Sequence, residues 1–315
     1  MDLKDKKILV TGGAGFLGSR IVEKLIERGV AREYISVPRS RDFDLRSAEA
    51  CARAVLGQDI VIHAAATTGG IVFHEEHPAK VFYDNLMMGV ELMEASRKAG
   101  VEKFVTIGSA TEYPENAPIP YAEENLWLGI TEPIHIPYTI AKKMLLVQGT
   151  AYRAQYGFNA IHLLLTNMYG PGEKLEREYV IPSVIKRIWK AMQEGKEVIE
   201  VWGTGRPTRD FLYVDDAAEA VVLALEKYDK PEPVNIGSGF EVSIAELAHM
   251  IAEIMGFTGK IFWNTEKPDG QMRRVLDTRR AEREFGFRAR TDFKTGLTAT
   301  VEWYQQEIER SNIKN

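Results

Sequence analysis

Three side chains have the types and spacing needed to move a proton at a carbonyl oxygen. Tyr138 and Lys142 are four residues apart, so a helix predicted over 138–156 places both on one face. The lysine can lower the pKa of the phenol and hold a ribose, while the phenol exchanges a proton with a substrate oxygen. Ser109 ends the preceding predicted strand, where its hydroxyl can bind the same oxygen. The three residues predict an enzyme in which hydride moves at the adjoining carbon.

A glycine triplet predicts where the hydride carrier binds. Gly12, Gly15 and Gly18 follow the apolar run Ile8–Val10 and open a helical pattern. Backbone N–H groups at a helix N-terminus bind a dinucleotide pyrophosphate, and side chains there would block its approach. The alternative is a tight turn that only packs a helix on a sheet. We expect a dinucleotide, because the triplet stands between a strand and a helix.

Two arginines after the second predicted strand, 34–37, indicate which dinucleotide binds. NAD sites place a carboxylate there for the ribose hydroxyls, whereas NADP needs positive charge for its 2′-phosphate. Arg39 and Arg41 precede the first carboxylate, and arginine binds phosphate through a bidentate fork. We therefore expect NADP(H), with both arginines as ligands and Asp44 and Leu45 at the adenine. The alternative is that both arginines are solvated surface residues.

The composition is that of a globular protein and excludes several other classes. The 315 residues are 45% hydrophobic and 27% charged, with a net charge of −5. Nucleic-acid proteins and polybasic membrane binders need clustered positive charge, which this balance disfavours. The single cysteine, Cys51, excludes a disulfide framework and a thiolate metal cluster. Apolar runs are too short for a signal peptide or a membrane span, so we expect a cytoplasmic protein.

The chain supplies a scaffold of short β-type runs that alternate with helical patterns. Strands are predicted over 8–10, 34–37, 59–63, 103–107 and 160–165, and helices over 79–98, 138–156 and 293–308. This alternation is typical of an α/β fold, a Rossmann-type doubly wound parallel sheet covered on both faces. We predict an NADP-binding Rossmann domain over 1–168. A smaller mixed α/β substrate lobe is predicted over 169–315, with part of the chain crossing back.

Further motifs occur in a fixed order along nearly the whole chain. They include Thr67-Thr68-Gly69-Gly70-Ile71, Ile107-Gly108-Ser109, Tyr138-Thr139-Ile140-Ala141-Lys142, Thr166-Asn167-Met168-Tyr169-Gly170-Pro171, Val180-Ile181-Pro182 and Arg209-Asp210-Phe211-Leu212-Tyr213. In these motifs the chain resembles the extended short-chain dehydrogenase/reductase family, and its GDP-L-fucose synthase branch most closely. The resemblance implies a C-terminal lobe that binds a nucleotide diphosphate-sugar. It also implies a homodimer formed through the helices near 79–98 and 138–156.

The resemblance implies roles for individual residues. Ser109, Tyr138 and Lys142 would be catalytic, with Thr111 beside them. Cofactor contacts are expected at Gly12, Gly15, Phe16, Leu17, Gly18, Arg39, Arg41, Asp44, Leu45, Ala64, Ala65, Asn85, Ile107, Tyr138, Lys142, Leu165, Asn167 and Met168. Substrate contacts are expected at Gly70, Ser109, Thr111, Asn167, Tyr179, Val180, Arg187, Trp202, Arg209 and Arg274. In chemical terms, two of these arginines, Arg187 and Arg209, can pair with a diphosphate, and Trp202 can stack on a base.

Two positions depart from the fucose synthase pattern. That reaction epimerises two carbons beside a 4-keto group before reducing it, which requires a cysteine and a histidine. The matching positions here hold Thr111 and Tyr179, whose hydroxyl groups are poor replacements at neutral pH. We therefore predict reduction of a 4-keto-hexose on GDP or a related nucleotide, without 3,5-epimerisation.

Other functions remain open alternatives. Ser109-Ala110-Thr111 with Tyr113 also resembles UDP-glucose 4-epimerases, which keep NAD tightly bound and give no net redox change. A non-catalytic cofactor-sensing protein is a remote alternative. Dehydration is not expected, because the related 4,6-dehydratases carry an Asp-Glu pair where this chain has Ala110-Thr111. Glu112 comes one position later, where an alternating strand would turn its side chain away from the site. We expect no metal site, and the pair His74 and His77 is expected on a surface loop, because no third ligand accompanies it. The resemblance places this loop at the border of the active site, so a substrate contact is the alternative.

Overall fold

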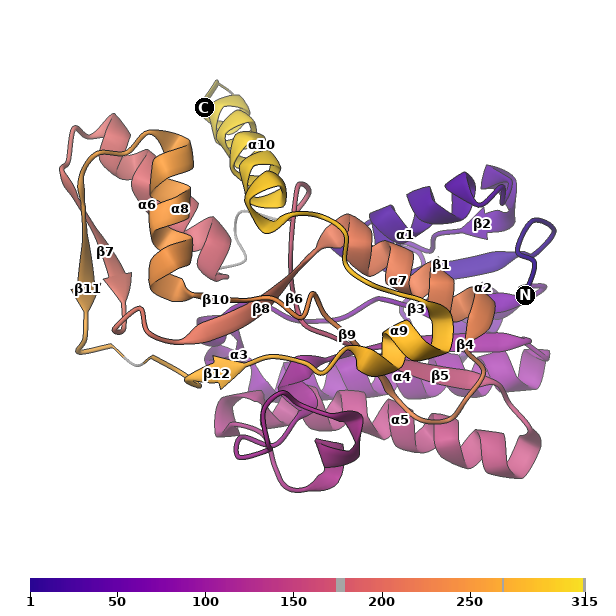
Figure 1. The fold of residues 1–315 in the computed structure, drawn as a ribbon. Coiled ribbons are helices and arrows are strands. Elements are labelled where there is room, and N and C mark those ends of the chain that lie inside the picture. Colours follow the sequence, from indigo (N-terminus) through magenta and orange to yellow (C-terminus); the bar gives the residue numbers. More distant parts are fainter. Residues whose placement is uncertain (174–178, 268, 314–315) are drawn as a thin grey trace.

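A six-stranded parallel sheet forms the centre of the computed structural model, which describes residues 1–173, 179–267 and 269–313. Its strand order is β2-β1-β3-β4-β5-β9 (Figure 1). The strands are β1 (Ile8–Thr11), β2 (Ile35–Ser36), β3 (Ile60–His63), β4 (Lys103–Ser109), β5 (Ala160–Leu165) and β9 (Val234–Ile236). The chain runs from β1 outward to β2 and then returns to β3 on the other side of β1. The strand order therefore reverses beside β1, as in doubly wound folds.

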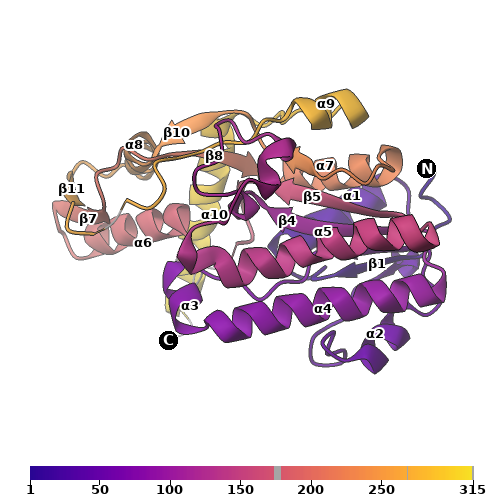
Figure 2. The same cartoon turned by 90° about the horizontal axis from the view of Figure 1, so that it is seen from below.

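Helices cover both faces of this sheet, as the two views in Figures 1 and 2 agree. One face carries α1 (Phe16–Glu27) packed on α7 (Val214–Lys227), and the other carries α2 (Ala48–Val55), α4 (Pro78–Ala99) and α5 (Ile136–Tyr156). Separate apolar clusters fill the two layers between helices and sheet. Strands buried on both faces read as continuous apolar runs, which is why the sequence revealed them. The predicted Rossmann-type α/β fold is confirmed.

A smaller second lobe consists of short strands and helices. Its central strand is β8 (Thr208–Tyr213), which pairs antiparallel with β10 (Glu241–Ser243) and parallel with β6 (Asn167–Tyr169) and β12 (Arg273–Arg274). The other elements are β7 (Val198–Trp202), β11 (Lys260–Asn264), α6 (Val180–Gln193), α8 (Ile244–Met255) and α10 (Phe293–Ile313). These three helices enclose an apolar core of their own with β7 and β8. The lobe is a mixed α/β unit, as predicted.

Part of the second half of the chain returns to the central sheet. β9 forms the edge of that sheet, α7 lies on α1, and α9 (Arg279–Phe285) packs beside both β9 and α7. The connections contain α3 (Ile71–Glu76) and four 3₁₀ turns: η1 (Arg32–Tyr34), η2 (Ala110–Glu112), η3 (Glu123–Trp127) and η4 (Pro133–His135). Among the predicted elements the largest boundary difference is in α10, which continues to Ile313 instead of ending at residue 308.

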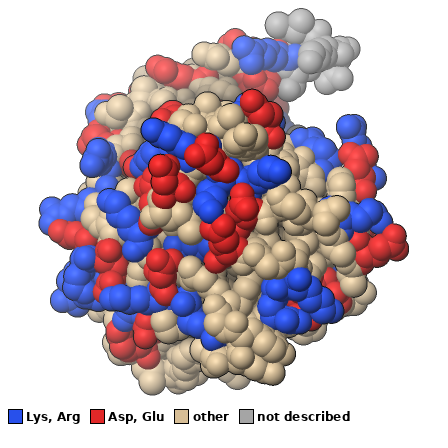
Figure 3. All heavy atoms as spheres, turned by 90° about the vertical axis from the view of Figure 1, so that its right-hand side faces the viewer, with Lys and Arg blue, Asp and Glu red and all other residues tan. Residues whose placement is uncertain are grey.

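The surface carries charges of both signs. On the face in Figure 3, Lys and Arg side chains are interspersed with Asp and Glu. In the described part of the chain, no helix has the length and apolar character needed to cross a bilayer.

Candidate active site

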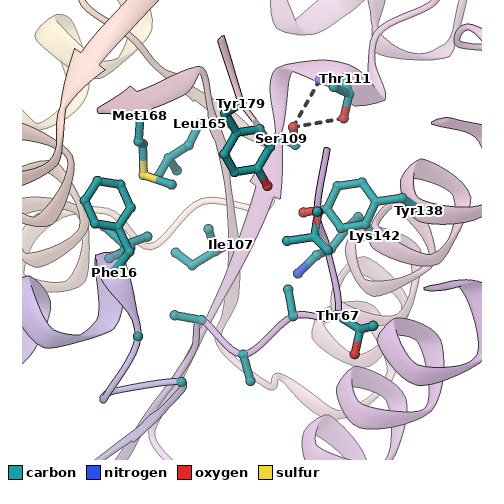
Figure 4. Close-up of a pocket in the computed structure, with 18 of the residues that line it drawn as sticks. Phe16, Thr67, Ile107, Ser109, Thr111, Tyr138, Lys142, Leu165, Met168 and Tyr179 are labelled. Carbon is teal, nitrogen blue, oxygen red and sulfur yellow. Dashed lines mark hydrogen bonds between the residues drawn. The ribbon is translucent and has the colours of Figure 1, made fainter. Parts of the chain in front are cut away.

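A pocket of about 900 Å³ opens at the carboxyl ends of the central strands. It extends from the turn after β1, past the ends of β3, β4 and β5, to α6 and the loop before β12. It therefore begins where the strand order reverses, the position at which doubly wound sheets bind ligands. Figure 4 shows its centre, where side chains from both lobes face one another.

Most residues predicted at the site line this pocket. From the cofactor set these are Gly12, Gly15, Phe16, Leu17, Gly18, Arg39, Asp44, Leu45, Ala64, Ala65, Ile107, Leu165, Asn167 and Met168. From the catalytic and substrate sets they are Gly70, Ser109, Thr111, Tyr138, Lys142, Tyr179, Val180, Arg209 and Arg274. Four predicted residues, all within the described ranges, do not line it: Arg41, Asn85, Arg187 and Trp202.

The turn after β1 is packed too closely against its own backbone and the loop after β3 to accept side chains at Gly12 and Gly18. Gly12 has a φ of +69°, and a Cβ there would lie 2.8 Å from the backbone of Ala64 and Ala65. A Cβ on Gly18 would overlap the backbone of Gly12. α1 begins at Phe16 without a side-chain cap, which leaves its first N–H groups for a ligand. The cradle therefore fits the pyrophosphate of a dinucleotide.

The two arginines predicted at the 2′-phosphate have different surroundings. Arg39 lines the pocket beyond β2, next to Ser40. The N–H groups of Asp42 and Phe43 both donate to the carbonyl oxygen of Arg39, so the chain turns sharply here. This turn leaves the side chain of Arg41 83% exposed and 3.3 Å from the carboxylate of Asp42. Of the two arginines, Arg39 alone lines the pocket.

A charged cluster borders the same end of the pocket, and of its members the sequence predicted only Asp44 at the site. Arg46 donates to Asp44 at 2.8 Å and to Asp84 at 2.9 Å, and Lys80 pairs with Asp84 at 2.7 Å. All four residues line the pocket. Hydrogen bonds from Arg46 lower the pKa of Asp44 to about 2. The spacing of Lys80 and Asp84 on a predicted helix was a usable signal, whereas nothing local marked Arg46.

Asn85 supports the wall of the pocket instead of lining it. It is buried, its Nδ2 donates to the carbonyl oxygen of Thr67 at 2.8 Å, and its Oδ1 accepts from the Thr67 N–H at 3.1 Å. The predicted direct cofactor contact of Asn85 is therefore replaced by a contact with the loop after β3. That loop, in turn, lines the pocket through Thr67.

Tyr138 and Lys142 lie one turn apart on α5 and face the centre of the pocket (Figure 4). The Nζ of Lys142 is 5.9 Å from the centroid of the Tyr138 ring. Lys142 is 2% exposed, and this burial lowers the pKa of its ammonium to about 8. The ring of His74 also packs edge-on against the phenol, with its centroid 5.6 Å away. Two nitrogen-bearing side chains therefore lie close to the phenol.

Ser109 lies where β4 ends and the chain turns into η2. The hydroxyl of Thr111 donates to the Ser109 oxygen at 2.9 Å, and the Thr111 N–H donates to it at 3.2 Å (Figure 4). Because the oxygen accepts twice, its own hydrogen remains to be donated into the pocket. The structure thus brings Ser109 and Thr111 together as a hydrogen-bonded pair.

Glu112 also belongs to this turn, and the predicted alternating strand is wrong here. The strand ends at Ser109, and Glu112 is the last residue of η2. Its Oε1 accepts the N–H of Ser109 at 2.8 Å, which completes a capping box. The carboxylate is fully buried and does not line the pocket, so its predicted orientation away from the site is correct.

The far wall of the pocket carries polar groups from elements distant in sequence. Arg274 donates to Glu132 at 3.0 Å and to Gln271 at 3.0 Å, and His135 lies 3.2 Å from the same Glu132 carboxylate. The adjacent His135 and the charge of Arg274 lower the pKa of Glu132. Across the pocket, Tyr179 projects into the central space (Figure 4). His135 and Gln271 were not predicted, because their proximity to Arg274 depends on tertiary folding.

The two histidines predicted on a surface loop differ: His77 is exposed between α3 and α4, as predicted, whereas His74 is buried. His74 lies on α3, is 5% exposed and lines the pocket. Burial lowers its pKa to about 4, so the imidazole is neutral at pH 7. Among the described residues, no cluster of three or more His, Cys, Asp or Glu side chains is arranged to hold a metal ion.

The residues predicted to contact the nucleotide lie in two separate places. Arg209 lines the pocket, and burial together with the neighbouring Arg274 lowers its pKa to about 10. Arg187 instead donates to the carbonyl oxygen of Glu200 and lies 5.8 Å from the ring of Trp202. Trp202 is 45% exposed. Arg187 and Trp202 therefore form a separate group outside the pocket.

Comparison with known proteins identifies the family. Residues 8–237 match the NAD dependent epimerase/dehydratase family, and the chain belongs to this family. The chain is 38% identical over 310 residues to a GDP-L-fucose synthase of Sinorhizobium fredii, which covers 97% of this chain and 98% of that protein. It is 37% identical over 312 residues to a probable GDP-L-fucose synthase 1 of Oryza sativa subsp. japonica, with 97% and 94% covered.

The solved structures give the same result at the level of the fold. A GDP-mannoheptose C4 reductase from Campylobacter jejuni, solved with NADP bound, matches with a TM-score of 0.86 and 29% identity. The match covers 96% of this chain and 99% of that one. The predicted resemblance to extended short-chain dehydrogenase/reductases is thereby confirmed.

Proposed function

We propose that this chain is an NADPH-dependent enzyme that reduces the 4-keto group of a GDP-linked hexose. The observation that carries the proposal is the position of Ser109, Tyr138 and Lys142 in one continuous pocket. This pocket has a pyrophosphate cradle at one end and Arg209 and Arg274 at the other. The names of the relatives support a GDP-sugar as substrate and reduction at C4 as the reaction.

The dinucleotide, when bound, supplies hydride to the sugar carbon. The backbone of Gly12 and the start of α1 would hold its pyrophosphate, and Arg39 would bind a 2′-phosphate. Glycine is needed for the close backbone approach, and a guanidinium provides the charge that distinguishes NADP from NAD. Arg39 in the pocket thus argues against the alternative of a 4-epimerase with tightly bound NAD.

The protein's own residues manage the proton. The hydroxyl of Ser109 donates a hydrogen bond to the 4-keto oxygen, and the phenol of Tyr138 gives its proton to that oxygen as negative charge develops. The ammonium of Lys142 stabilises the phenolate that remains and would hold the nicotinamide ribose. Burial of Lys142 strengthens its electrostatic interaction, because little water screens the ammonium.

The second lobe would bind the nucleotide diphosphate. Arg209 sits in a partly buried part of the pocket, where a guanidinium gains most from pairing with phosphate oxygens. Arg274 is already held by Glu132 and Gln271, which fixes its position for the same role. On this view residues 1–168 bind the cofactor and residues 169–315 bind the nucleotide-sugar, apart from the segments that return to the central sheet.

The chain lacks the acid–base residues that would epimerise the sugar ring. The thiol and imidazole positions hold Thr111 and Tyr179, and both side chains line the pocket. The hydroxyl of Thr111 is engaged as a donor to Ser109, which gives it a supporting role in carbonyl binding. We infer reduction at C4 without 3,5-epimerisation.

A homodimer through α4 and α5 and a cytoplasmic location complete the proposal. The two helices lie side by side on one face (Figure 2). That face exposes large apolar side chains, with Tyr83 55%, Val147 45% and Phe82 37% exposed. A second copy packed on this face would remove these side chains from water.

The test is consumption of NADPH, followed by its absorbance, with a GDP-linked 4-keto-hexose. Tyr138→Phe should lower kcat about 10²- to 10⁴-fold, because the general acid is lost, while the Kd for NADPH changes little. Tyr34→Phe, an exposed tyrosine outside both the pocket and the face formed by α4 and α5, is the control for handling and folding. Turnover of Tyr138→Phe at the wild-type rate would reject the assignment.

A further inference from the structure

Three buried polar side chains, Glu112, His162 and Thr106, are hydrogen-bonded in a row next to Ser109. The proposed reaction does not use them. Glu112 is fully buried and His162, on β5, is 2% exposed. The Oε2 of Glu112 is 3.2 Å from Nε2 of His162, and Nδ1 of His162 is 2.6 Å from the hydroxyl of Thr106. Burying polar groups costs free energy unless they are hydrogen-bonded, and these hydrogen bonds hold the buried side chains in one arrangement.

The backbone is adapted to bring the pair together. Gly108 lies between the two side chains, and a Cβ at this position would overlap both the His162 ring and the Glu112 carboxylate. The ladder pairs Gly108 with Leu164 and Thr106 with His162, so His162 projects beside the end of β4 from the neighbouring strand. Because a carboxylate only accepts, the hydrogen between the pair belongs to Nε2 of His162.

The carboxylate has a second partner that links it to catalysis. Its other oxygen, Oε1, accepts the N–H of Ser109 at 2.8 Å. One end of Glu112 is therefore held by a rigid imidazole, and the other end fixes the turn from which the Ser109 hydroxyl projects. α5 packs against this turn, so the same carboxylate also faces the lysines of α5.

We propose that Glu112 and His162 are a positioning pair that sets the Ser109 hydroxyl and supplies the negative charge facing Lys142. This role rests on the proposed function of Ser109 and Lys142. The groups that face Glu112 are His162 on β5, Tyr113 in its own turn, and Lys142 and Lys143 on α5.

The charge of Glu112 raises the pKa of Lys142. Burial lowers the pKa of this ammonium to about 8, and the charge of Glu112 acts against that decrease. The other titratable groups near Lys142 are Tyr138, one turn earlier on α5, and His63 on β3. Burial lowers the pKa of His63 to about 3, so this imidazole stays neutral at neutral pH. Without Glu112, Lys142 would lose its proton at lower pH.

Two substitutions separate position from charge. Glu112→Gln keeps an oxygen for the Ser109 N–H but removes the charge, so the alkaline limb of the kcat profile should move down by about one pH unit. Glu112→Asp keeps the charge but is too short for the Ser109 N–H, so kcat should fall about 10- to 100-fold with the limb unmoved. In both variants the Kd for NADPH should stay near the wild-type value.

The matched control is Glu123→Gln. Glu123 is also buried, accepts a backbone N–H from Asn235 at 3.0 Å and pairs with Arg280, but its charge is not among those that act on Lys142. Its substitution should leave the alkaline limb in place. If Glu112 had only a structural role, Glu112→Gln would change the stability of the protein but would not shift the alkaline limb of the kcat profile.

A readout without turnover separates this proposal from the proposed function. The Nζ resonance of Lys142 in protein with nitrogen-15-labelled lysine, assigned by its loss in Lys142→Met, should titrate lower by about one pH unit in Glu112→Gln. Unchanged titration, or a Glu112→Asp variant with wild-type kcat, would overturn the pair. If the wild type reduces no GDP-linked 4-keto-hexose, the proposed function fails, and the lysine titration alone decides the pair. If Glu112→Gln does not fold, Glu112→Asp carries the test through kcat.

Discussion

Replacing Arg39 by alanine should weaken NADPH binding while leaving NADH binding nearly unchanged. Arg39 lines the pocket beyond β2, where the adenosine ribose of a dinucleotide lies in this fold. A hydrogen bond between charged groups contributes about 1.5–3 kcal/mol. At about 1.4 kcal/mol per tenfold change, Arg39→Ala should raise the Kd for NADPH about 10- to 100-fold. NADH lacks the 2′-phosphate, so its Kd should change less than about twofold.

Arg41 provides the matched control for this experiment. It is two residues away and carries the same charge, but it is 83% exposed and turned toward Asp42. Arg41→Ala should therefore change the Kd for NADPH by less than about twofold, because solvent and salt screen an exposed charge. Fluorescence titration of both dinucleotides measures all values without a sugar substrate. Equal losses of NADPH and NADH in Arg39→Ala, or equal losses of NADPH in both variants, would refute the assignment of the 2′-phosphate site.

Two further predictions concern the proton chemistry. The rate of ketone reduction should fall as pH rises through about 8, because the folded-state pKa of Lys142 is lowered to about that value and the neutral amine no longer stabilises the phenolate. A pH profile of kcat checks this, and a rate that stays constant up to pH ~10, the ordinary range of a lysine, would contradict it. In D₂O the product should carry no more deuterium at C3 and C5 than the substrate kept without enzyme, because Thr111 and Tyr179 replace the acid–base pair of epimerisation. Proton NMR of the product measures this, and enzyme-dependent exchange at either carbon would show that the pocket still epimerises.

The parts of the site that the sequence could predict are those built from short-range patterns. The glycine turn after β1 and the Tyr138–Lys142 spacing on α5 depend on residues a few places apart, so strand and helix periodicity suffices to place them. Ser109 was predicted at the site because it ends a buried strand. The strands themselves were visible because parallel strands covered on both faces are continuously apolar.

The remaining parts depend on tertiary contacts or on local turns. The link between Arg274 and Glu132 joins residues 142 positions apart, and no local pattern predicts it. Arg41 was expected at the 2′-phosphate, but the chain turns after Arg39 and Arg41 does not line the pocket. Glu112 was assigned to a strand that in fact ends at Ser109 in a capping box. Trp202 and Arg187 were expected at the substrate, but they pack on each other outside the pocket.

The central claim is that hydride passes from NADPH to C4 of the sugar in this pocket. It is tested most directly with NADPH that carries deuterium at the transferred position of its nicotinamide ring. Proton NMR of the product formed from a GDP-linked 4-keto-hexose should show deuterium at C4, in an amount equal to the NADPH consumed. A product without deuterium at C4, or a 4-epimerised sugar formed with no consumption of NADPH, would contradict the account.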